Sequence, residues 1–532
     1  MQAPTILGRR RTFLLGSLLV VAGVLLHLPM FGSAADMHYR MRGMAIDLPM
    51  AIGMMLLVGG MALGFAGVLR PRSDPHGAAQ VHRVAAVDES TLLPAHRVLI
   101  AGLIFAIAVD TQKPFTFTFI LPAVAAEYGL SSLAQLVPGA EPVAWLPFAG
   151  ILGTAIGSFA WGYLGDRIGR RSSILVAALL FVATSVCGVM PSFGGNILMC
   201  FLMGLGAGGM LPAAYTLLAE MIPAGRRGQV MVLVSGLGTA LGFLISSWTA
   251  TLLMPVFGWR ILWLAGLPTG LVLLAVSRYI PESPRYLLLH GRVAEAQRVL
   301  TRFGMVLVPE TAAAPPASLG SFSSVLRGSL GRITGALVFC GLAWGLVNFG
   351  FLVWLPTTVG ALGQATQDVT ELLAGAALFA VLGAVLVAHL YGRWSTRRTT
   401  IAATTLTGGT LVVFWTSGTE LARSSTLLPL VVVLLVGSWA VNAVLAPYSA
   451  EVYPTAVRAR GAALTAGAGK LGGVLALGMA VTGVAPPGLA SSAALAAVPM
   501  LLGAGLLHLV AVETRARPLE EIAAGGPTQV VR

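Results

Sequence analysis

The sequence predicts an all-α membrane protein with twelve transmembrane helices in two six-helix halves, preceded by two additional N-terminal transmembrane helices. Of its 532 residues, 56% are hydrophobic and only 10% are charged, whereas a soluble domain carries roughly 25% charged residues. Apolar runs of about 20 residues recur along the chain, and about 20 helical residues cross the roughly 30 Å of hydrocarbon in a bilayer. Helices are expected because every backbone polar group must be satisfied within the bilayer.

The N-terminus imitates an export signal, because Arg9 to Arg11 precede an apolar run at residues 13–31. A signal core is about 7 to 15 residues long, and this run of about 19 residues can span a membrane. A second run follows at residues 48–69. We therefore expect two retained helices and a basic linker within residues 1–97.

Twelve further apolar runs define the rest of the chain. They lie at residues 98–125, 143–164, 172–190, 196–221, 229–252, 260–279, 332–356, 370–391, 399–417, 426–449, 460–483 and 488–511. The longest interior polar segment divides them six and six. We expect an N-terminal half at residues 98–280, a cytoplasmic linker at 281–331, a C-terminal half at 332–511 and a cytoplasmic tail at 512–532.

The basic residues predict the orientation. With a cytoplasmic N-terminus, 27 of the 33 Lys and Arg residues lie in cytoplasmic loops or termini, as the positive-inside rule requires. The exceptions are Arg40, Arg42, Arg260 and Arg423 outside and Lys113 and Lys470 within spans. We expect a plasma (inner) membrane protein with both termini cytoplasmic, and no nucleic-acid partner, because topology explains the excess of positive charge.

Enzymatic chemistry has no support in the sequence. Cys187, Cys200 and Cys340 lie singly in apolar runs, without the spacing of a disulfide framework or a zinc site. Phosphate-binding and nucleophile motifs are absent. We therefore expect no metal, no cofactor and no catalytic residues.

Short polar motifs recur between the halves. "GDRIGRRSS" follows the second run of the first half and corresponds to "YGRWSTRRTT" in the second half. "AEMIPAGRRG" follows the fourth run of the first half and corresponds to "AEVYPTAVRARG". The two offsets agree to within a few residues, which indicates an internal repeat.

With "GLGAGGMLPAAYTLLAE", "PESPRYLLLHGR" and "ETRARPLEE", these motifs resemble the major facilitator superfamily over about residues 95–522. "VDTQKPFTFTFILPAVAAEYGLS" and "NFGFLVWLPTTV" are similar to its proton-coupled metabolite symporters, the subgroup related to nicotinate and aromatic-acid carriers and synaptic-vesicle glycoproteins. The resemblance implies transport by alternating access. One departure is Cys200, which stands where the family has an arginine four residues before Gly204.

The resemblance also implies a cytoplasmic gate that latches the two halves. We expect its residues to be Gly165, Asp166, Arg167, Gly169, Arg170, Arg171, Glu220, Arg226, Arg227, Glu282, Arg285, Glu451, Arg458 and Arg460. The two loop glycines permit a tight connection between helices, and an aspartate suits a helix N-terminus. The structural alternative is that these charges only anchor helix ends.

The first run of the N-terminal half carries the strongest candidates for a transport site. Asp110 and Lys113 are three residues apart and share a helix face, Gln112 lies beside them, and Pro114 lacks the N–H that would bind the Asp110 carbonyl. Our hypothesis is that Lys113 keeps Asp110 ionised until a substrate anion competes for Lys113, whereupon Asp110 takes a proton. A structural ion pair is the alternative.

Other polar or aromatic residues within spans are further candidates. They are Tyr215, Trp344, Asn348, Trp354, Asn442, Tyr448 and Lys470. Helix packing or interfacial anchoring is the alternative for each aromatic residue, and Lys470 could bind a substrate carboxylate or a backbone carbonyl. We expect His389 at the surface, and helix packing as the main role of the glycines at 204–209.

These observations predict a secondary active transporter, a proton-coupled symporter of a small organic anion or aromatic carboxylate. Its partners would be that small molecule, a proton and the lipid bilayer, and we expect a monomer. A sugar carrier of the same fold is the first alternative, although the fifth run, "VSGLGTALGFLISSW", lacks the glutamine of sugar porters. Drug or cation carriers and a non-transporting membrane sensor are the others.

Overall fold

The computed structural model describes residues 6–69, 82–86, 91–133, 135–309, 325–418, 420–421, 425–453, 457–485 and 488–515. They form two compact units. Unit 1 comprises Met1–Thr116, Ala149–Pro223 and Thr249–Glu310, and unit 2 comprises Phe117–Phe148, Ala224–Trp248 and Thr311–Arg532. The boundary runs through three helices, α4 (Pro94–Tyr128), α5 (Trp145–Ile168) and α9 (Ala224–Phe257).

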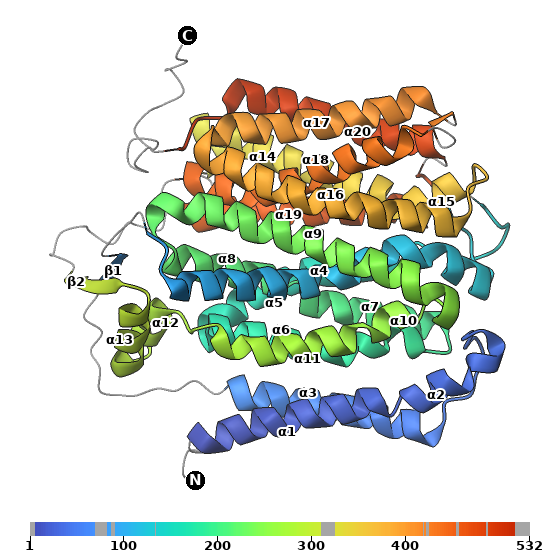
Figure 1. Ribbon diagram of the computed structural model, residues 1–532, viewed down its shortest axis with the longest axis horizontal. Coiled ribbons are helices and arrows are strands. Elements are labelled where there is room, and N and C mark those ends of the chain that lie inside the picture. Colours follow the sequence, from blue (N-terminus) through green and yellow to red (C-terminus); the bar gives the residue numbers. More distant parts are fainter. Residues whose placement is uncertain are drawn as a thin grey trace. The chain divides into compact units, whose positions relative to one another are not determined.

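The remaining helices follow the predicted runs in chain order (Figure 1). Before α9 these are α1 (Ile6–Leu25), α2 (Leu28–Ser33), α3 (Leu48–Leu69), α5 (Trp145–Ile168), α6 (Arg170–Ala183), the 3-10 helix η2 (Thr184–Val189), α7 (Phe193–Ala207) and α8 (Met210–Met221). After it come α10 (Ile261–Leu264), α11 (Gly266–Val276), α12 (Pro284–Leu289) and α13 (Val293–Arg302). Unit 2 adds α14 (Gly328–Gly345), the π-helix η5 (Leu346–Phe351), α15 (Leu355–Gly360), α16 (Thr366–Arg393), α17 (Thr396–Ser417), α18 (Leu427–Val452), α19 (Arg458–Val481) and α20 (Leu489–Val510).

Thirteen helical segments of the described chain are long and apolar enough to span a membrane. The remaining predicted run forms α17, a 22-residue helix that contains eight threonines. Several of these side chains are buried, and their hydroxyls donate to carbonyls one turn earlier, as Thr400 and Thr407 do at 2.8 Å. Because these hydroxyls are satisfied within the helix, α17 packs against α18 and α20 like its apolar neighbours.

The two extra N-terminal helices form a hairpin that packs on α6 within unit 1. A Cβ atom on Gly64 would lie 2.4 Å from Leu179 Cδ2 of α6, so the Leu179 side chain packs closely against the backbone of α3. The loop between α2 and α3 is fastened at Tyr39, whose carbonyl accepts a hydrogen bond of 3.1 Å from the fully buried Arg260. The Tyr39 ring lies between Phe31, at 4.8 Å, and Phe257, at 5.6 Å.

The segments expected as linkers contain a small sheet that the sequence did not predict. Strand β1 (His82–Ala86) pairs antiparallel with β2 (Met305–Pro309), with His82 opposite Pro309 and Ala86 opposite Met305. Between α11 and β2 the chain forms α12, which Ser283 caps by accepting a hydrogen bond from the Tyr286 N–H, and α13.

Close backbone contacts pack helices within each unit. On α7, a Cβ atom at Gly204 would lie 2.0 Å from the Gly150 carbonyl oxygen of α5, and one at Gly208 would lie 2.5 Å from Ser158 N. In unit 2, a Cβ atom at Gly345 of α14 would lie 2.4 Å from the Gly469 carbonyl oxygen of α19. The packing role predicted for Gly204 is confirmed, because only glycine permits this separation.

Candidate functional site

Lys113 lies in the interior of unit 1 with 1% of its surface exposed. Its Nζ donates hydrogen bonds to the Phe181 carbonyl of α6 and to Thr184 Oγ1 at 2.8 Å. The same nitrogen lies 4.0 Å from the centroid of the Phe181 ring. Because α6 ends at Ala183, the Phe181 carbonyl belongs to the last turn of the helix, where the helix dipole favours a cation.

The other two polar residues of this stretch are also buried. Asp110 is 5% exposed and Gln112 is 1% exposed. Gln112 Oε1 accepts a hydrogen bond of 3.1 Å from Thr269 Oγ1 of α11. Lys113 and Gln112 therefore link α4 to α6 and α11 within unit 1, and the pairing of Asp110 with Lys113 stays a prediction.

Two thiols lie beside this cluster. Cys200, at the position where the family has an arginine, forms a hydrogen bond with Cys187 of η2, and both lie close enough to Lys113 for electrostatic interaction. Cys187 Sγ also donates to the Met199 carbonyl at 3.3 Å. A buried lysine from α4 is thus present in unit 1, although α7 does not supply a basic residue at position 200.

A second polar group lies in unit 2. Trp344 Nε1 donates to the Ser438 carbonyl at 2.8 Å, and Asn348 Nδ2 donates to Ser438 Oγ at 3.3 Å. Asn348 belongs to the π-helix η5, which interrupts the predicted seventh run, and such interruptions are frequent at functional sites. Two of the predicted residues therefore meet at Ser438 of α18, a residue that the sequence analysis did not single out.

The remaining transport candidates are dispersed. Trp354 is buried with its Nε1 donating to the Phe349 carbonyl at 3.1 Å, and Tyr448 exchanges hydrogen bonds with the backbone of Val512. These contacts fit packing roles. His389 is exposed as expected, whereas Tyr215, Asn442 and Lys470 are half-buried.

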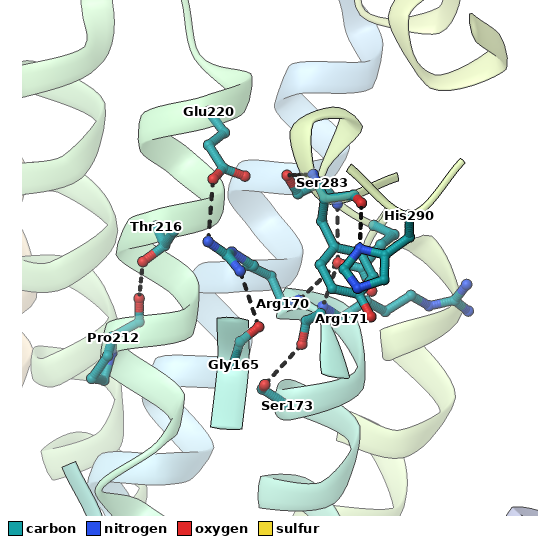
Figure 2. Close-up of polar contacts among 12 residues, drawn as sticks. Gly165, Arg170, Arg171, Ser173, Pro212, Thr216, Glu220, Ser283 and His290 are labelled. Carbon is teal, nitrogen blue, oxygen red and sulfur yellow. Dashed lines mark hydrogen bonds and ion pairs between the residues drawn. The ribbon is translucent and has the colours of Figure 1, made fainter. Parts of the chain in front are cut away.

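Several gate residues of unit 1 meet around Arg170 (Figure 2). The Glu282 carboxylate accepts hydrogen bonds from the N–H groups of Arg170, at 2.7 Å, and Arg171, at 3.2 Å. Arg170 Nη1 donates to the Gly165 carbonyl at 3.0 Å, and its Nη2 lies 3.5 Å from Glu220 Oε1. Glu282 thus stabilises the N-terminus of α6, and we call these residues the Arg170 cluster.

Gly169 makes room for this contact. Its φ is +94°, and a Cβ atom there would lie 2.4 Å from Glu282 Oε2. The loop is held further by Tyr286, whose hydroxyl donates to the Arg167 carbonyl at 3.1 Å.

Unit 2 contains an equivalent arrangement around two carboxylates. Glu451 accepts hydrogen bonds from the Tyr391 hydroxyl at 2.9 Å and from Thr514 Oγ1 at 2.6 Å. Glu513 accepts from the N–H of Thr396 at 3.1 Å and from the hydroxyls of Thr396 and Ser395. Glu513 therefore stabilises the N-terminus of α17 as Glu282 stabilises that of α6, and the hydroxyls of Thr396 and Thr514 link the two carboxylates.

The sequence analysis missed Glu513, although a signal was present. "ES" at residues 282–283 and "ET" at 513–514 each follow the last helix of a half, and their offset matches that of the "AEMIPAGRRG" repeat.

The pKa values of the two equivalent carboxyl groups are shifted in opposite directions. Burial raises the pKa of Glu282, and the N–H groups of Ser283, Arg171 and Arg170 offset only part of this effect. Burial also acts to raise the pKa of Glu513, but hydrogen bonds from Ser395 and Thr396 outweigh it, so the pKa lies below its ordinary value.

The other gate residues give a mixed result. Arg226 and Arg285 are exposed, whereas Arg227 and Arg460 are half-buried. The side chains of Asp166 and Arg458 lie outside the described residues. A latch that joins the two halves therefore remains a prediction.

Thirteen membrane-length helical segments, with charged and amide side chains buried among them, define a polytopic membrane protein of transporter type. The chain belongs to the Major Facilitator Superfamily, because the model of that family matches residues 98–477. It is therefore a membrane transporter and not an enzyme.

Two bacterial relatives illustrate the similarity. The chain is 28% identical over 387 residues to the niacin transporter NiaP of Acinetobacter baylyi, an alignment that covers 71% of this chain and 87% of the relative. It is 31% identical over 402 residues to the 4-hydroxybenzoate transporter PcaK of the same organism, with coverage of 72% and 84%.

Among solved structures, the proton:xylose symporter XylE has the same fold. The superposition has a TM-score of 0.62 at 17% sequence identity and covers 80% of this chain and 98% of XylE. The part of the chain before residue 98 lies outside the family match.

Proposed function

We propose that the protein is a proton-coupled symporter of a small aromatic carboxylate. The observation that carries the proposal is the buried Lys113, whose described hydrogen-bond partners are a carbonyl and a hydroxyl. A positive charge within a membrane span is costly unless a partner or a function balances it. A substrate carboxylate would add a negative charge beside this ammonium group.

The relatives support the substrate class. Niacin and 4-hydroxybenzoate, the compounds in the names of NiaP and PcaK, are both aromatic rings that carry one carboxyl group. Trp344 offers an aromatic face and Asn348 an amide in unit 2, and both converge on Ser438. Such groups suit a flat ring with one polar substituent.

Proton coupling completes the proposal. Lys113 and Asp110 are both titratable and buried in the same stretch, and the approach of an anion would favour the binding of a proton by one of them. Proton and carboxylate would then cross together as a neutral pair, which avoids moving net charge through the bilayer.

Uptake into proteoliposomes tests the proposal. The purified full-length protein is reconstituted, an inward proton gradient is imposed with the membrane potential clamped, and radiolabelled niacin and 4-hydroxybenzoate are offered separately. We expect accumulation of at least one of them above its external concentration, which a protonophore abolishes. Equal uptake by empty and protein-containing vesicles for both probes would overturn the substrate class.

A cation carrier is the second candidate, because a segment resembles a relative of that kind. The chain is 35% identical over 195 residues to organic cation/carnitine transporter 7 of Arabidopsis thaliana, which covers 37% of that relative. Carnitine and tetraethylammonium are therefore included in the same assay. Uptake of tetraethylammonium without uptake of either carboxylate would favour this second function.

The orientation and the gate are part of the same proposal. We infer an inner-membrane protein with cytoplasmic termini. The Arg170 cluster and the hydrogen-bonded group around Glu451 and Glu513 rearrange as the carrier alternates between its open states. Reporter fusions at Arg532 and in the Arg40 loop test the topology: the terminus should be cytoplasmic and the loop external. The reverse result would overturn the orientation.

A further inference from the structure

We propose that Lys113 is the group that binds and releases the coupled proton, with the C-terminal end of α6 as its docking site. The inference rests on the proposed function, because it assigns the proton carrier within that transport cycle. It differs from the hypothesis drawn from the sequence, in which Asp110 takes the proton.

The surroundings of Lys113 match an ammonium group. An ammonium has three N–H donors, and three acceptors surround Nζ: the Phe181 carbonyl, Thr184 Oγ1 and the face of the Phe181 ring. All three are neutral, so release of the proton does not break an ion pair with any of them. The dipole at the end of α6 and the ring attract the charged form alone.

Three titratable groups lie near Lys113. Asp110 comes from its own helix, Cys187 from η2 and Cys200 from α7. The contacts from α6 and η2 are made by Phe181 and Thr184, and that from α11 by Gly266, none of which titrates. Gly266 lies so close that a Cβ atom there would be 2.8 Å from Lys113 Cε, so the lysine side chain packs directly against α11.

The proton balance follows directly. In the substrate-free carrier the Lys113 amine takes one proton from the side of higher proton concentration and becomes an ammonium. The positive charge then pairs with the substrate carboxylate, and the pair crosses as a neutral unit. After the carboxylate dissociates on the other side, the ammonium returns its proton to water there, and the amine resets the carrier.

Protonation also changes how firmly α4 is attached to α6. The neutral amine retains two N–H donors for the carbonyl and the hydroxyl, but it loses its attraction to the helix dipole and the ring. The α6–η2 junction, where the α-helix gives way to a 3-10 helix, is therefore the element that senses the proton.

Lys113→Arg separates this assignment from one in which Asp110 carries the proton, because arginine keeps its positive charge throughout the accessible pH range. Two assays are compared in proteoliposomes: exchange of labelled for unlabelled niacin or 4-hydroxybenzoate, which needs no proton gradient, and accumulation driven by an imposed gradient. Because Lys113 also pairs with the carboxylate, accumulation is expressed relative to the exchange rate of the same variant. We expect this ratio to fall at least tenfold and to be independent of pH. Gradient-driven accumulation at the wild-type level would overturn the assignment to Lys113.

Thr184→Val is a second variant that does not depend on fitting an arginine. It removes one acceptor of the ammonium, so the proton is released more easily, and the pH of half-maximal accumulation should fall by about one unit. Thr370→Val is the matched control, because both threonines are 3% exposed and both donate to a carbonyl one turn earlier at 2.8 Å. Equal pH profiles for the two variants would contradict the proposal.

The controls also separate failure of this inference from failure of the proposed function. If the wild-type protein neither exchanges nor accumulates the two carboxylates, the proposed function is wrong. If the wild type does both and Lys113→Arg accumulates them with the same pH dependence, only the proton-carrying role of Lys113 is wrong.

Discussion

Gly266 determines where Lys113 can lie. The nearest atoms to a Cβ at this position are the end of the lysine side chain, at 2.8 Å, and Ser185 Oγ, at 2.9 Å. Since these atoms belong to side chains, the protein can relieve the clash by moving them rather than by shifting its backbone. A substitution here should therefore change function more than folding.

We predict that Gly266→Ala displaces Lys113 from the Phe181 carbonyl. Transport of niacin or 4-hydroxybenzoate should fall several-fold, while the melting temperature of the solubilised protein changes little. Gly375→Ala is the control, because nothing lies within 4 Å of a Cβ atom there, and it should transport like the wild type. Normal transport by Gly266→Ala would show that the position of Lys113 is unimportant.

Glu513 provides a pH-dependent contribution to stability. Its pKa lies below the ordinary value of about 4.3, so the ionised carboxylate is favoured in the folded protein. This contribution is complete above the ordinary pKa and is lost as the pH falls through the lower pKa of the folded state. Hydrogen bonds to the N-terminus of α17 are its cause.

Glu513→Gln should therefore lower the melting temperature at pH 6 to 7, by an amount that corresponds to about 1 to 2 kcal/mol. The difference from the wild type should shrink as the pH is lowered from about 5 to 3, because the wild-type carboxylate becomes neutral too. Glu371→Gln alters an exposed glutamate of α16 and should match the wild type at each pH. A difference for Glu513→Gln that stays constant with pH would contradict the interpretation.

At the scale of elements, the contact between α5 and α7 is set by backbone atoms rather than by side chains. The Gly150 carbonyl oxygen lies where a Cβ atom of residue 204 would be, at 2.0 Å, and the backbone cannot move away as a side chain can. Trp161 adds a hydrogen bond of 2.8 Å from its Nε1 to the Leu205 carbonyl. The two helices therefore move as one body.

We predict that Gly204→Ala destabilises unit 1 by about 2 kcal/mol or more, because a methyl group forces the helices apart. Gly162→Ala on α5 is the control, since a Cβ atom there has no neighbour within 4 Å. Thermal unfolding in detergent, followed by size-exclusion chromatography, measures both. Equal melting temperatures would mean that the helices separate without cost.

Elements differ in how well the sequence predicts them. Membrane helices are encoded by long apolar runs, and even the threonine-rich α17 was predicted as such a run; its hydroxyls bind within the helix. The π-helix around Asn348 was not, since one extra residue in a turn leaves no compositional signal. The β1–β2 pairing joins distant segments and depends on tertiary contacts that no local pattern specifies.

Side-chain chemistry was predicted less completely than its location. The sequence placed Lys113 inside a span, and the structure buries it. Its partners, Phe181 and Thr184, lie about 70 residues further along the chain, in a different helix. Ser438 was not predicted because a single serine within an apolar run has no distinguishing sequence pattern. Its role follows only from the hydrogen bonds that Trp344 and Asn348 make to it in the folded protein.

At the scale of the molecule, the N-terminal hairpin packs on α6 of unit 1, and the loop between α2 and α3 holds it further. Tyr39 holds it through its ring and its carbonyl, in a left-handed conformation with φ of 58° that costs a non-glycine residue about 1 kcal/mol. The loop accepts this strain because the aromatic contacts outweigh it.

Two substitutions of Tyr39 separate the contribution of its ring from the strain of its backbone. Tyr39→Ala loses the ring and keeps the strain, whereas Tyr39→Gly loses the ring and relieves the strain. Both should lower the melting temperature, and the alanine variant should be the less stable by about 1 kcal/mol. If the alanine variant were the more stable, the backbone at this position would carry no strain.

The β1–β2 ribbon has a consequence for biosynthesis. The ribbon joins His82–Ala86 to Met305–Pro309 by backbone hydrogen bonds. The chain between these strands, which contains the six helical runs of the first half, is therefore a closed loop. Such a tie can form only after residue 309 has left the ribosome, when those six runs have already been made. The ribbon therefore forms only after all six helical runs of the first half have been synthesised.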